Sequence, residues 1–391
     1  MLDAGKRQDG VIYKPNTAKN HQNTRSWPGR IATPFALSMK AERFDFLVIG
    51  STPAARLVAG LLASTHGKKV AWKGESQSGY RLQRGIDLSI APVTRPETWS
   101  LVRTCLPEVT RLVSRIAGRR AWSSVDPVLL ARSAGSKEAL AHLRHMATGF
   151  GHEAERLPSR LLGPDADVLV VRDAALLDRG VLEPPFDLWL ERHKVYRVPP
   201  ETVIDLGEDG SAGLNGPDHA HFASQTILAD DEAVLHHLPP ATWPNLLLRQ
   251  AHSTVLMHSA HALMAPVMLE LGTGLQLTQQ GNGIRVHGPG TIDMVAGLLG
   301  GLMSSRSTLC QAGQSHYHSL ASADGAPLAG AIGGSGPIVL SGFGSLAAFL
   351  APSIARWLAK AASNAEGAWF SQRSPDRTAS GSMVADWGGA G

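Results

Sequence analysis

The sequence has little cysteine, which limits the kinds of site it can build. Only Cys105 and Cys310 occur among 391 residues, so there is no disulfide framework and no cysteine-rich metal site. This cysteine usage is typical of a reducing compartment, and we expect a cytoplasmic protein. The sixteen histidines are no substitute, because none belongs to an HExxH motif or to another complete zinc-binding pattern. We therefore expect no metal site.

Long hydrophobic runs are also scarce. The longest candidate, 337–355, is uncharged but contains two glycines and two prolines. A membrane-spanning helix needs about 20 apolar residues, whereas this composition indicates a strand, a turn and a buried helix. The first 40 residues lack the apolar core of a secretory signal. We therefore expect no transmembrane span.

Positive charge is concentrated at one end of the chain. Residues 1–40 hold seven Lys or Arg against two Asp, a balance of +5, while the whole chain carries +4 and the remainder therefore −1. The densest basic stretch of that remainder, 111–120, lies on a predicted helix that also has an apolar face. We expect a flexible basic tail over 1–40 and no nucleic-acid partner.

Two common catalytic motifs are absent, and a different one opens the ordered part of the chain. Neither a GxSxG elbow nor a GxxxxGK[ST] loop occurs, so hydrolases and P-loop enzymes have no sequence basis. Residues 44–49 predict a buried strand, 54–65 a helix rich in Ala and Leu, and 66–72 a turn and a second strand. This β–α–β order is typical of the start of a doubly wound sheet.

The turn after the first strand reads GSTPAA and resembles a dinucleotide-binding turn. Gly50 matches the glycine of the tight bend, and Ala55 is a small residue at the third position of the motif. Thr52 replaces the glycine that lets the backbone approach phosphate, and Pro53 removes one backbone N–H from the helix start. Lys73 stands where an acid normally binds ribose hydroxyls. The turn indicates the fold more strongly than a bound dinucleotide.

Four segments, taken in order, resemble the FAD-dependent D-amino-acid oxidase superfamily, which includes glycine and sarcosine oxidases. They are VIGSTPAARLVAG at 48–60, DRGVLEPPFDLWL at 178–190, GNGIRVHGPG at 281–290, and 322–359. The last is the most specific, because it keeps an Asp324-Gly325-x-Pro327 turn and a strand leading into Gly342-Phe343-Gly344. Chance would rarely place all four segments in the family's order.

The resemblance implies an FAD-dependent oxidoreductase that moves hydride from a CH–NH substrate to the flavin. It implies these cofactor-binding residues: Gly50, Ser51, Thr52, Ala55 and Lys73 at the diphosphate and ribose, and Gly342, Phe343, Gly344 and Ser345 at the flavin. Arg285, which shares a strand face with His287, is the expected binder of a substrate carboxylate. No catalytic base can be named.

The resemblance also implies an α/β fold, with a discontinuous Rossmann-like FAD-binding domain and an inserted antiparallel-sheet substrate domain. We assign 41–95, 165–235 and 320–365 to the first, 96–164 to helical cover, 236–319 to the second, and 366–391 to a disordered tail. Two functions stay open. One is an oxidoreductase acting on a small-molecule substrate. The other is a non-catalytic subunit or scaffold of the same fold, with a protein partner and with weak or lost FAD binding.

Overall fold

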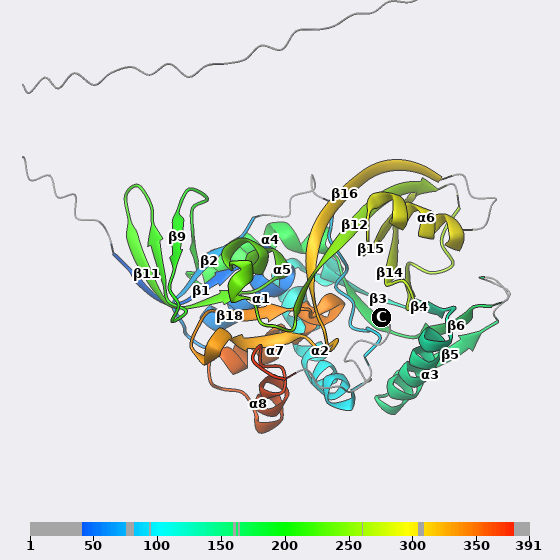
Figure 1. Ribbon diagram of the computed structural model, residues 1–391, viewed down its shortest axis with the longest axis horizontal. Helices are drawn as coiled ribbons and strands as arrows, with labels where there is room; N and C mark the ends of the chain where they lie inside the picture. The colour runs from blue at the N-terminus through cyan, green and yellow to red at the C-terminus, as the bar shows by residue number, and fades with distance from the viewer. Residues whose placement is uncertain are drawn as a thin grey trace, which may run out of the picture. The chain divides into compact units, whose positions relative to one another are not determined.

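The computed structural model describes residues 41–75, 82–93, 95–158, 162, 165–259, 261–303 and 309–378, which belong to one unit, Met39–Gly391. The expected basic tail over 1–40 lies outside these residues. Two large sheets organise the unit, and Figure 1 labels many of their strands, numbered in chain order.

The first sheet is mainly parallel and has the order β17-β18-β11-β1-β2-β8. Its strands are β1 (Arg43–Ile49), β2 (Val70–Lys73), β8 (Tyr196–Arg197), β11 (Ala220–Leu228), β17 (Leu328–Ala331) and β18 (Ile338–Ser341). Only β17 runs antiparallel to its neighbour, and β9 (Val203–Leu206) and β10 (Ala212–Asn215) extend antiparallel from β11. In the β1–β11 pair Ile49 lies opposite Leu228, so the two strands end together at one edge.

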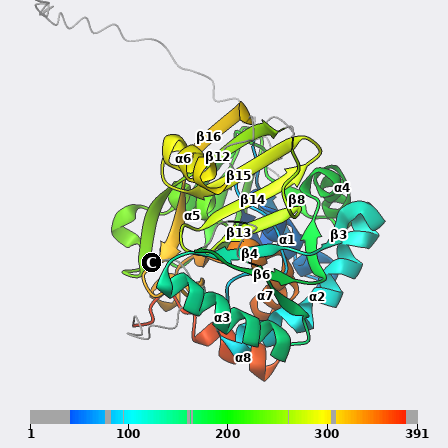
Figure 2. The same ribbon diagram turned by 90° about the vertical axis from the view of Figure 1, so that its right-hand side faces the viewer.

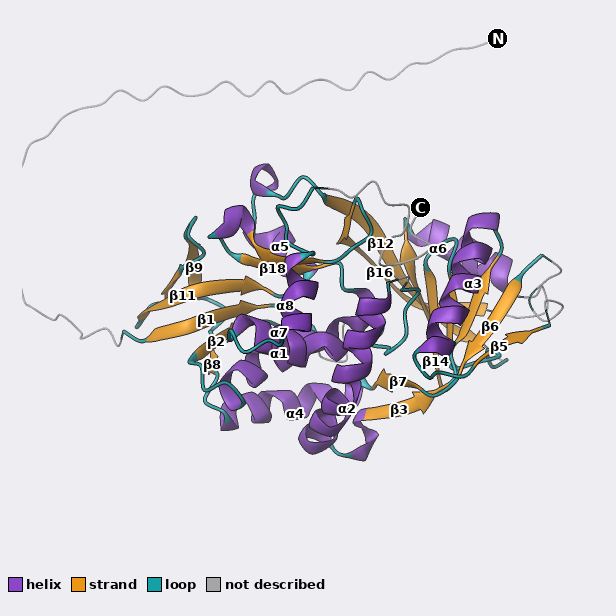
Figure 3. Cartoon of the chain, turned by 90° about the horizontal axis from the view of Figure 1, so that it is seen from below, coloured by secondary structure: helices purple, strands orange, loops and turns teal. Residues whose placement is uncertain are grey.

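Helices gather on one face of this sheet, as Figure 3 shows. They are α1 (Pro53–Ser64), α2 (Pro96–Ala117), α4 (Arg179–Arg192), α7 (Ala347–Leu358) and α8 (Asn364–Ser371). Thr52 caps α1 by accepting from the N–H of Ala55, and Pro53 suits the first helical turn. The other face packs against α5 (Asp231–His237) and the β9–β10 hairpin through a second apolar cluster.

The second sheet has the order β16-β12-β15-β14-β13-β4-β6-β5, and Figure 2 shows most of these strands next to one another. Its strands are β4 (Val128–Ala131), β5 (Ala154–Leu157), β6 (Asp167–Val171), β12 (Leu247–Ser259), β13 (Val267–Glu270), β14 (Leu275–Gln280), β15 (Gly283–Pro289) and β16 (Leu309–Ser322). All neighbours are antiparallel except β13 and β4. The remaining elements are α3 (Ala134–Gly149), α6 (Ile292–Leu302), the β3 (Trp122–Val125) and β7 (Ala174–Leu177) pair, and short 3-10 turns at 119–121, 240–242, 332–334 and 344–346.

Two segments in the middle of the chain were assigned to the wrong part of the fold. The segment 96–164, expected as helical cover, contains β4 and β5, and both strands join the second sheet. β6 joins that sheet too, although 165–235 was assigned to the first domain. All four residues of β4 are buried. A short apolar run predicts burial, but its pairing partner is set by contacts far along the chain.

The expected disorder from residue 366 onward is wrong for the described part of that segment. α8 continues to Ser371, and a capping box between Ser363 and Glu366 begins it. Trp369 and Phe370 are buried in the main apolar cluster. Two buried aromatic side chains stabilise a short helix that composition alone did not reveal. Residues 379–391 lie outside the described residues.

No described helix is long and apolar enough to cross a membrane. The uncharged run at 337–355 divides into β18, a glycine turn and the first part of α7. Nine of the twelve α7 residues are buried inside the protein. The run is apolar because it lies in the core of the first sheet and its helices.

Candidate active site

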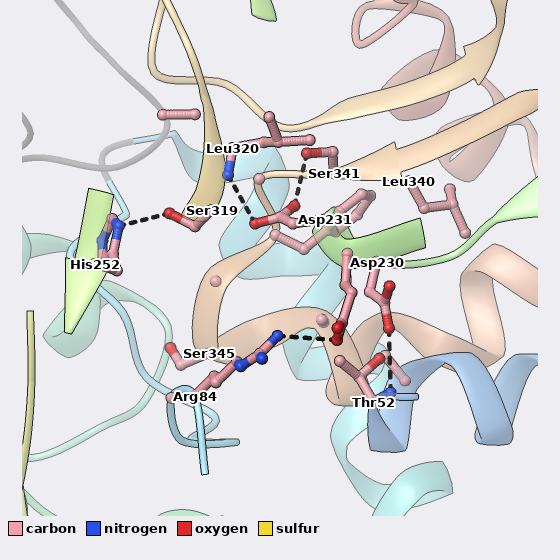
Figure 4. Close-up of a pocket in the computed structure, with 18 of the residues that line it drawn as sticks. Thr52, Arg84, Asp230, Asp231, His252, Ser319, Leu320, Leu340, Ser341 and Ser345 are labelled. Atoms are coloured by element: carbon pink, nitrogen blue, oxygen red, sulfur yellow. Dashed lines mark hydrogen bonds and ion pairs between the residues drawn. The ribbon is translucent and has the colours of Figure 1, made fainter. Parts of the chain in front are cut away.

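A cavity of about 710 Å³ lies where the carboxyl ends of the first sheet meet the second sheet. Thr52 follows β1, Asp230 follows β11 and Gly342 follows β18, and all three line it. His287 and Tyr317 line it from β15 and β16. In open α/β sheets ligands bind at the carboxyl ends of the strands, and this volume is typical of small-molecule sites. Figure 4 shows lining residues from both sheets.

The turn after β18 brings four of the expected flavin-binding residues to the cavity. Gly342, Phe343, Gly344 and Ser345 all line it. Gly342 and Gly344 have φ values of 74° and 53°, a backbone conformation that favours glycine. Ser345 is anchored from its other side, since its carbonyl oxygen accepts from Leu88 N–H.

The turn after β1 is held by hydrogen bonds from Trp72 and Glu75, in and just after β2. The Gly50 carbonyl accepts from the indole Nε1 of Trp72 at 2.9 Å, and Ser51 Oγ accepts from Glu75 N–H at 2.9 Å. A Cβ on Gly50 would lie 2.8 Å from Ala55 Cβ, so only glycine fits there. Of the expected residues here, Thr52 lines the cavity, whereas Gly50, Ser51 and Ala55 do not.

Lys73, expected at the ribose, is turned toward the neighbouring part of the sheet. Its Nζ donates to the carbonyl oxygens of Thr202 at 2.7 Å and Pro200 at 3.4 Å. Partial burial lowers the pKa of this amine. Lys73 does not line the cavity.

Asp230 was not among the predicted site residues, and its carboxylate occupies the N–H groups of the β1 turn. Oδ2 accepts from Ser51 N at 2.7 Å, and Oδ1 accepts from Ala233 N at 2.9 Å. Oδ2 also accepts from Thr52 N at 3.3 Å, as Figure 4 shows. Burial raises the pKa of Asp230 to about 6, and the charges of Asp231 and Glu232 act in the same direction.

Asp231, the next residue, is held by a different set of donors. It accepts from Leu320 N at 3.0 Å and from Ser341 Oγ at 2.8 Å, and so joins β16 to the end of β18 (Figure 4). Burial raises its pKa as well. The sequence signal for both acids is that they directly follow a buried strand, where parallel strands place functional groups.

The arginines that line the described part of the cavity are both paired with carboxylates. Arg84 bonds Glu232 at 2.9 Å, and its guanidinium lies 4.9 Å from the ring centre of Tyr317. Arg179 bonds Asp87 at 2.5 Å. Their positive charges are therefore partly neutralised before any ligand enters.

The second sheet contributes an uncharged polar group. The Tyr317 hydroxyl lies 2.5 Å from His287 Nδ1, and Ser319 Oγ lies 2.6 Å from His252 Nδ1. Burial lowers the pKa of His287 to about 3, lowers that of His252, and raises that of Tyr317. At neutral pH this surface presents an imidazole and a phenol, which exchange hydrogen bonds with a ligand without carrying charge.

Arg285 lies on the same face of β15 as His287, opposite the buried Ile284 and Val286, but it does not line the cavity. Its Nη1 donates to Gln83 Oε1 at 2.7 Å, and its Nε is buried without a partner in the described part of the chain. Burial lowers its pKa, and the nearby Arg179 acts in the same direction. Its expected role in carboxylate binding stays a prediction.

Among the described residues, no group of three or more His, Cys, Asp or Glu is placed to hold a metal ion. The adjacent His219 and His221 instead stack on one another, with ring centres 4.7 Å apart.

Comparison with known proteins finds likeness at the level of structure. No family model and no curated protein matches the sequence. L-proline dehydrogenase from P. horikoshii superposes with a TM-score of 0.67 at 13% identity, over 86% of this chain and 98% of that one. Glycine oxidase from Geobacillus kaustophilus gives 0.64 at 14% identity, over 83% and 96%. L-amino acid deaminase from Proteus vulgaris gives 0.62 at 12% identity, over 87% and 98%.

These matches extend over nearly the whole length of each neighbour and over more than four fifths of this chain. At such low identity they establish the fold and leave the chemistry to the residues of this chain. The chain shares the fold of these three proteins, and that α/β fold is the one its four sequence segments predicted.

Proposed function

We propose that this protein is an FAD-dependent oxidoreductase of the amino-acid or amine oxidase type. The observation that carries the proposal is a single cavity lined both by the glycine turn after β18 and by the uncharged Tyr317–His287 pair. The fold neighbours named above are an oxidase, a dehydrogenase and a deaminase of amino acids. A small molecule with a CH–NH group is the substrate class we propose.

The residues at the flavin end fit the cofactor. A Cβ on Gly344 would meet no atom within 4 Å, so the turn leaves open space beside its backbone. Gly342, Gly344 and Ser345 would hold the ring end, at the start of the turn that leads into α7. Helix N-termini stabilise negative charge. When bound, the flavin supplies the hydride acceptor.

The residues at the diphosphate end fit less well. Ser51 N and Thr52 N are the donors such a turn offers to phosphate, and both already donate to Asp230. The Thr52 hydroxyl is also committed, because it caps α1. The proposal is therefore an enzyme with weak FAD affinity.

The chain's own residues would orient the substrate. Tyr317 and His287 offer an uncharged donor and acceptor to an amine, which favours its neutral form in the cavity. Arg285 is the proposed carboxylate binder, because its Nη1 bonds a neutral amide and its Nε is unpartnered in the described chain. To reach the cavity it would have to exchange Gln83 for the substrate.

A second candidate is a non-catalytic subunit or scaffold with the same fold. Asp230 on the turn and Lys73 directed away from the cavity favour it, because both remove nucleotide-binding features. Its partner would be a protein, and the folded chain would need no cofactor.

An absorbance scan of the purified protein, before FAD is added and then in excess FAD by difference against free FAD, separates the two. The oxidoreductase predicts protein-bound flavin bands near roughly 370 and 450 nm that bleach when small amino acids or amines are added without oxygen. Absence of both bands after reconstitution would contradict it.

Thr52→Gly is the matched variant for this test. Glycine is nearly as good an N-cap as threonine, so the fold should tolerate the change. Tighter FAD binding by T52G would support a weakened but working site, whereas unchanged absence of binding would favour the scaffold.

A further inference from the structure

We infer that the Asp230 carboxylate is an internal substitute for the diphosphate of a nucleotide, seated on the β1 turn, and that it must leave before a nucleotide can bind there. The inference rests on the proposed function only in taking FAD as the incoming nucleotide. It makes Asp230 a determinant of cofactor affinity.

The geometry of the turn carries the first step. A dinucleotide diphosphate binds the backbone N–H groups at the start of the first helix. Here Asp230 Oδ2 lies 2.7 Å from Ser51 N and 3.3 Å from Thr52 N, which are those groups. Pro53 has no N–H to offer in their place. One anion at a time can accept from this pair.

The position of Asp230 follows from strand pairing. β1 and β11 are parallel neighbours, and Ala229 N donates to Ile49 O at 2.8 Å just beyond the paired residues. The next residue of the β11 chain therefore lies above the β1 turn. Gly50 leaves room for it, because a Cβ there would come 2.9 Å from Asp230 Oδ2.

Charge strengthens the competition. Asp231 and Glu232 follow Asp230 directly and both disfavour further negative charge beside it. Arg84, which lines the cavity, is already paired with Glu232 at 2.9 Å. Lys73 directs its amine to the carbonyl oxygens of residues 200 and 202. A diphosphate would add two negative charges at the turn where the Asp230 carboxylate already carries one.

The same carboxylate also accepts from the backbone N–H groups that would otherwise need a ligand. Helix starts leave N–H groups unsatisfied unless a side chain or ligand accepts from them. Asp230 satisfies the α1 turn through Oδ2 and caps α5 through Oδ1. The cofactor-free chain therefore has no unfilled anion site at this turn.

The test is a titration of the full-length Asp230→Ala variant and of the natural chain with FAD and, separately, with ADP, followed by tryptophan fluorescence. ADP carries the diphosphate without the flavin, so its binding reports on the turn alone. Removing an internal charged acceptor should lower both dissociation constants at least about tenfold. Asp230→Asn, which keeps the shape and removes the charge, should change them in the same direction and serves if the alanine variant does not fold.

Glu232→Gln is the control for charge alone, because it removes one negative charge from the same segment without touching the turn. It should change ADP affinity by less than a third of the Asp230→Ala effect. Equal effects of the two variants, or no gain in ADP affinity for either Asp230 variant, would overturn the inference.

The result also separates this inference from the proposed function. If Asp230→Ala gains ADP affinity but no variant gives a flavin that amino acids or amines can bleach, the internal substitute stands and the oxidoreductase proposal fails. If the natural chain binds FAD tightly and Asp230→Ala changes nothing, the oxidoreductase proposal survives and the inference fails.

Discussion

At the scale of single residues, the cavity is governed by buried groups whose charge is unfavourable. Asp230 has its pKa raised to about 6 and His287 has its pKa lowered to about 3, in both cases mainly by burial. The two groups have opposite effects on stability. A histidine that stays neutral in the folded protein lowers stability as pH falls below the pKa of the unfolded chain. A carboxyl whose pKa is raised in the folded protein lowers stability as pH rises above the pKa of the unfolded chain.

We predict that Asp230→Asn changes the pH dependence of stability. Below about pH 3.8 the natural carboxyl is protonated in both states, and between there and about pH 6 the unfolded chain ionises while the folded one resists. The natural protein therefore loses stability over this window and the variant does not. The melting temperature of the variant minus that of the natural chain should rise by about 2 °C or more from pH 4 to pH 6.5, which is on the order of 1 kcal/mol.

The variant also loses one hydrogen-bond acceptor, but that loss is the same at every pH and does not alter the slope. A difference in melting temperature that stays flat from pH 4 to pH 6.5 would show that Asp230 ionises as easily in the folded chain as in the unfolded one.

At the scale of elements, α1 is set in place by close packing against α4. A Cβ on Gly60 would lie 2.1 Å from an atom of the Trp189 ring, so these helices approach closer than alanine permits. Trp189 is itself buried in the main apolar cluster. The approach matters for the site, because α1 begins at the turn that Asp230 occupies.

We predict that Gly60→Ala destabilises the protein by about 1–3 kcal/mol, the usual cost of overpacking a filled core. The control is Gly297→Ala in α6, where a Cβ would meet nothing within 4 Å. That change should be neutral or stabilise by roughly 0.5–1 kcal/mol, because alanine is the better helix former. Urea unfolding measures both, and a Gly60→Ala variant as stable as its control would contradict the packing described here.

At the scale of the whole molecule, the core ranges from β1 to α8, and the segments that build it are interleaved along the chain. The first sheet draws strands from residues 43–73, 196–228 and 328–341, while the second draws from 128–171 and 247–322. Trp369 and Phe370, close to the end of the described chain, pack in the same cluster as Val48 and Leu57 near its start.

We predict that a chain beginning at Met39 melts within about 4 °C of the full-length protein, a margin of roughly 2–3 kcal/mol at this size. Residues 1–40 carry a balance of +5 and only scattered apolar residues, so little surface is available to offset the entropy of ordering them. Met39 precedes β1 by four residues. Differential scanning calorimetry of the two chains measures the difference, and a larger fall would show that the first segment contributes to the folded body.

The sequence by itself determined the fold class and much of one side of the cavity. The β–α–β opening and the glycine turn at 342–345 are local patterns, so they could be predicted from neighbouring residues. The order of the four segments then predicted the superfamily fold, which contains both a Rossmann-like sheet and an antiparallel sheet. Thr52 and the residues of the 342–345 turn line the cavity, and their role in binding FAD stays a prediction.

Only the tertiary structure decided which residues meet across long separations. Asp230 lies 179 positions from Ser51, yet the pairing of β1 with β11 brings its carboxylate onto the turn. The same is true of β4, β5 and β6, which join the second sheet, and of Lys73, which is directed toward Thr202. Periodicity tells which side chains are buried, but the partner of a strand and the direction of a long side chain depend on contacts that no local pattern contains.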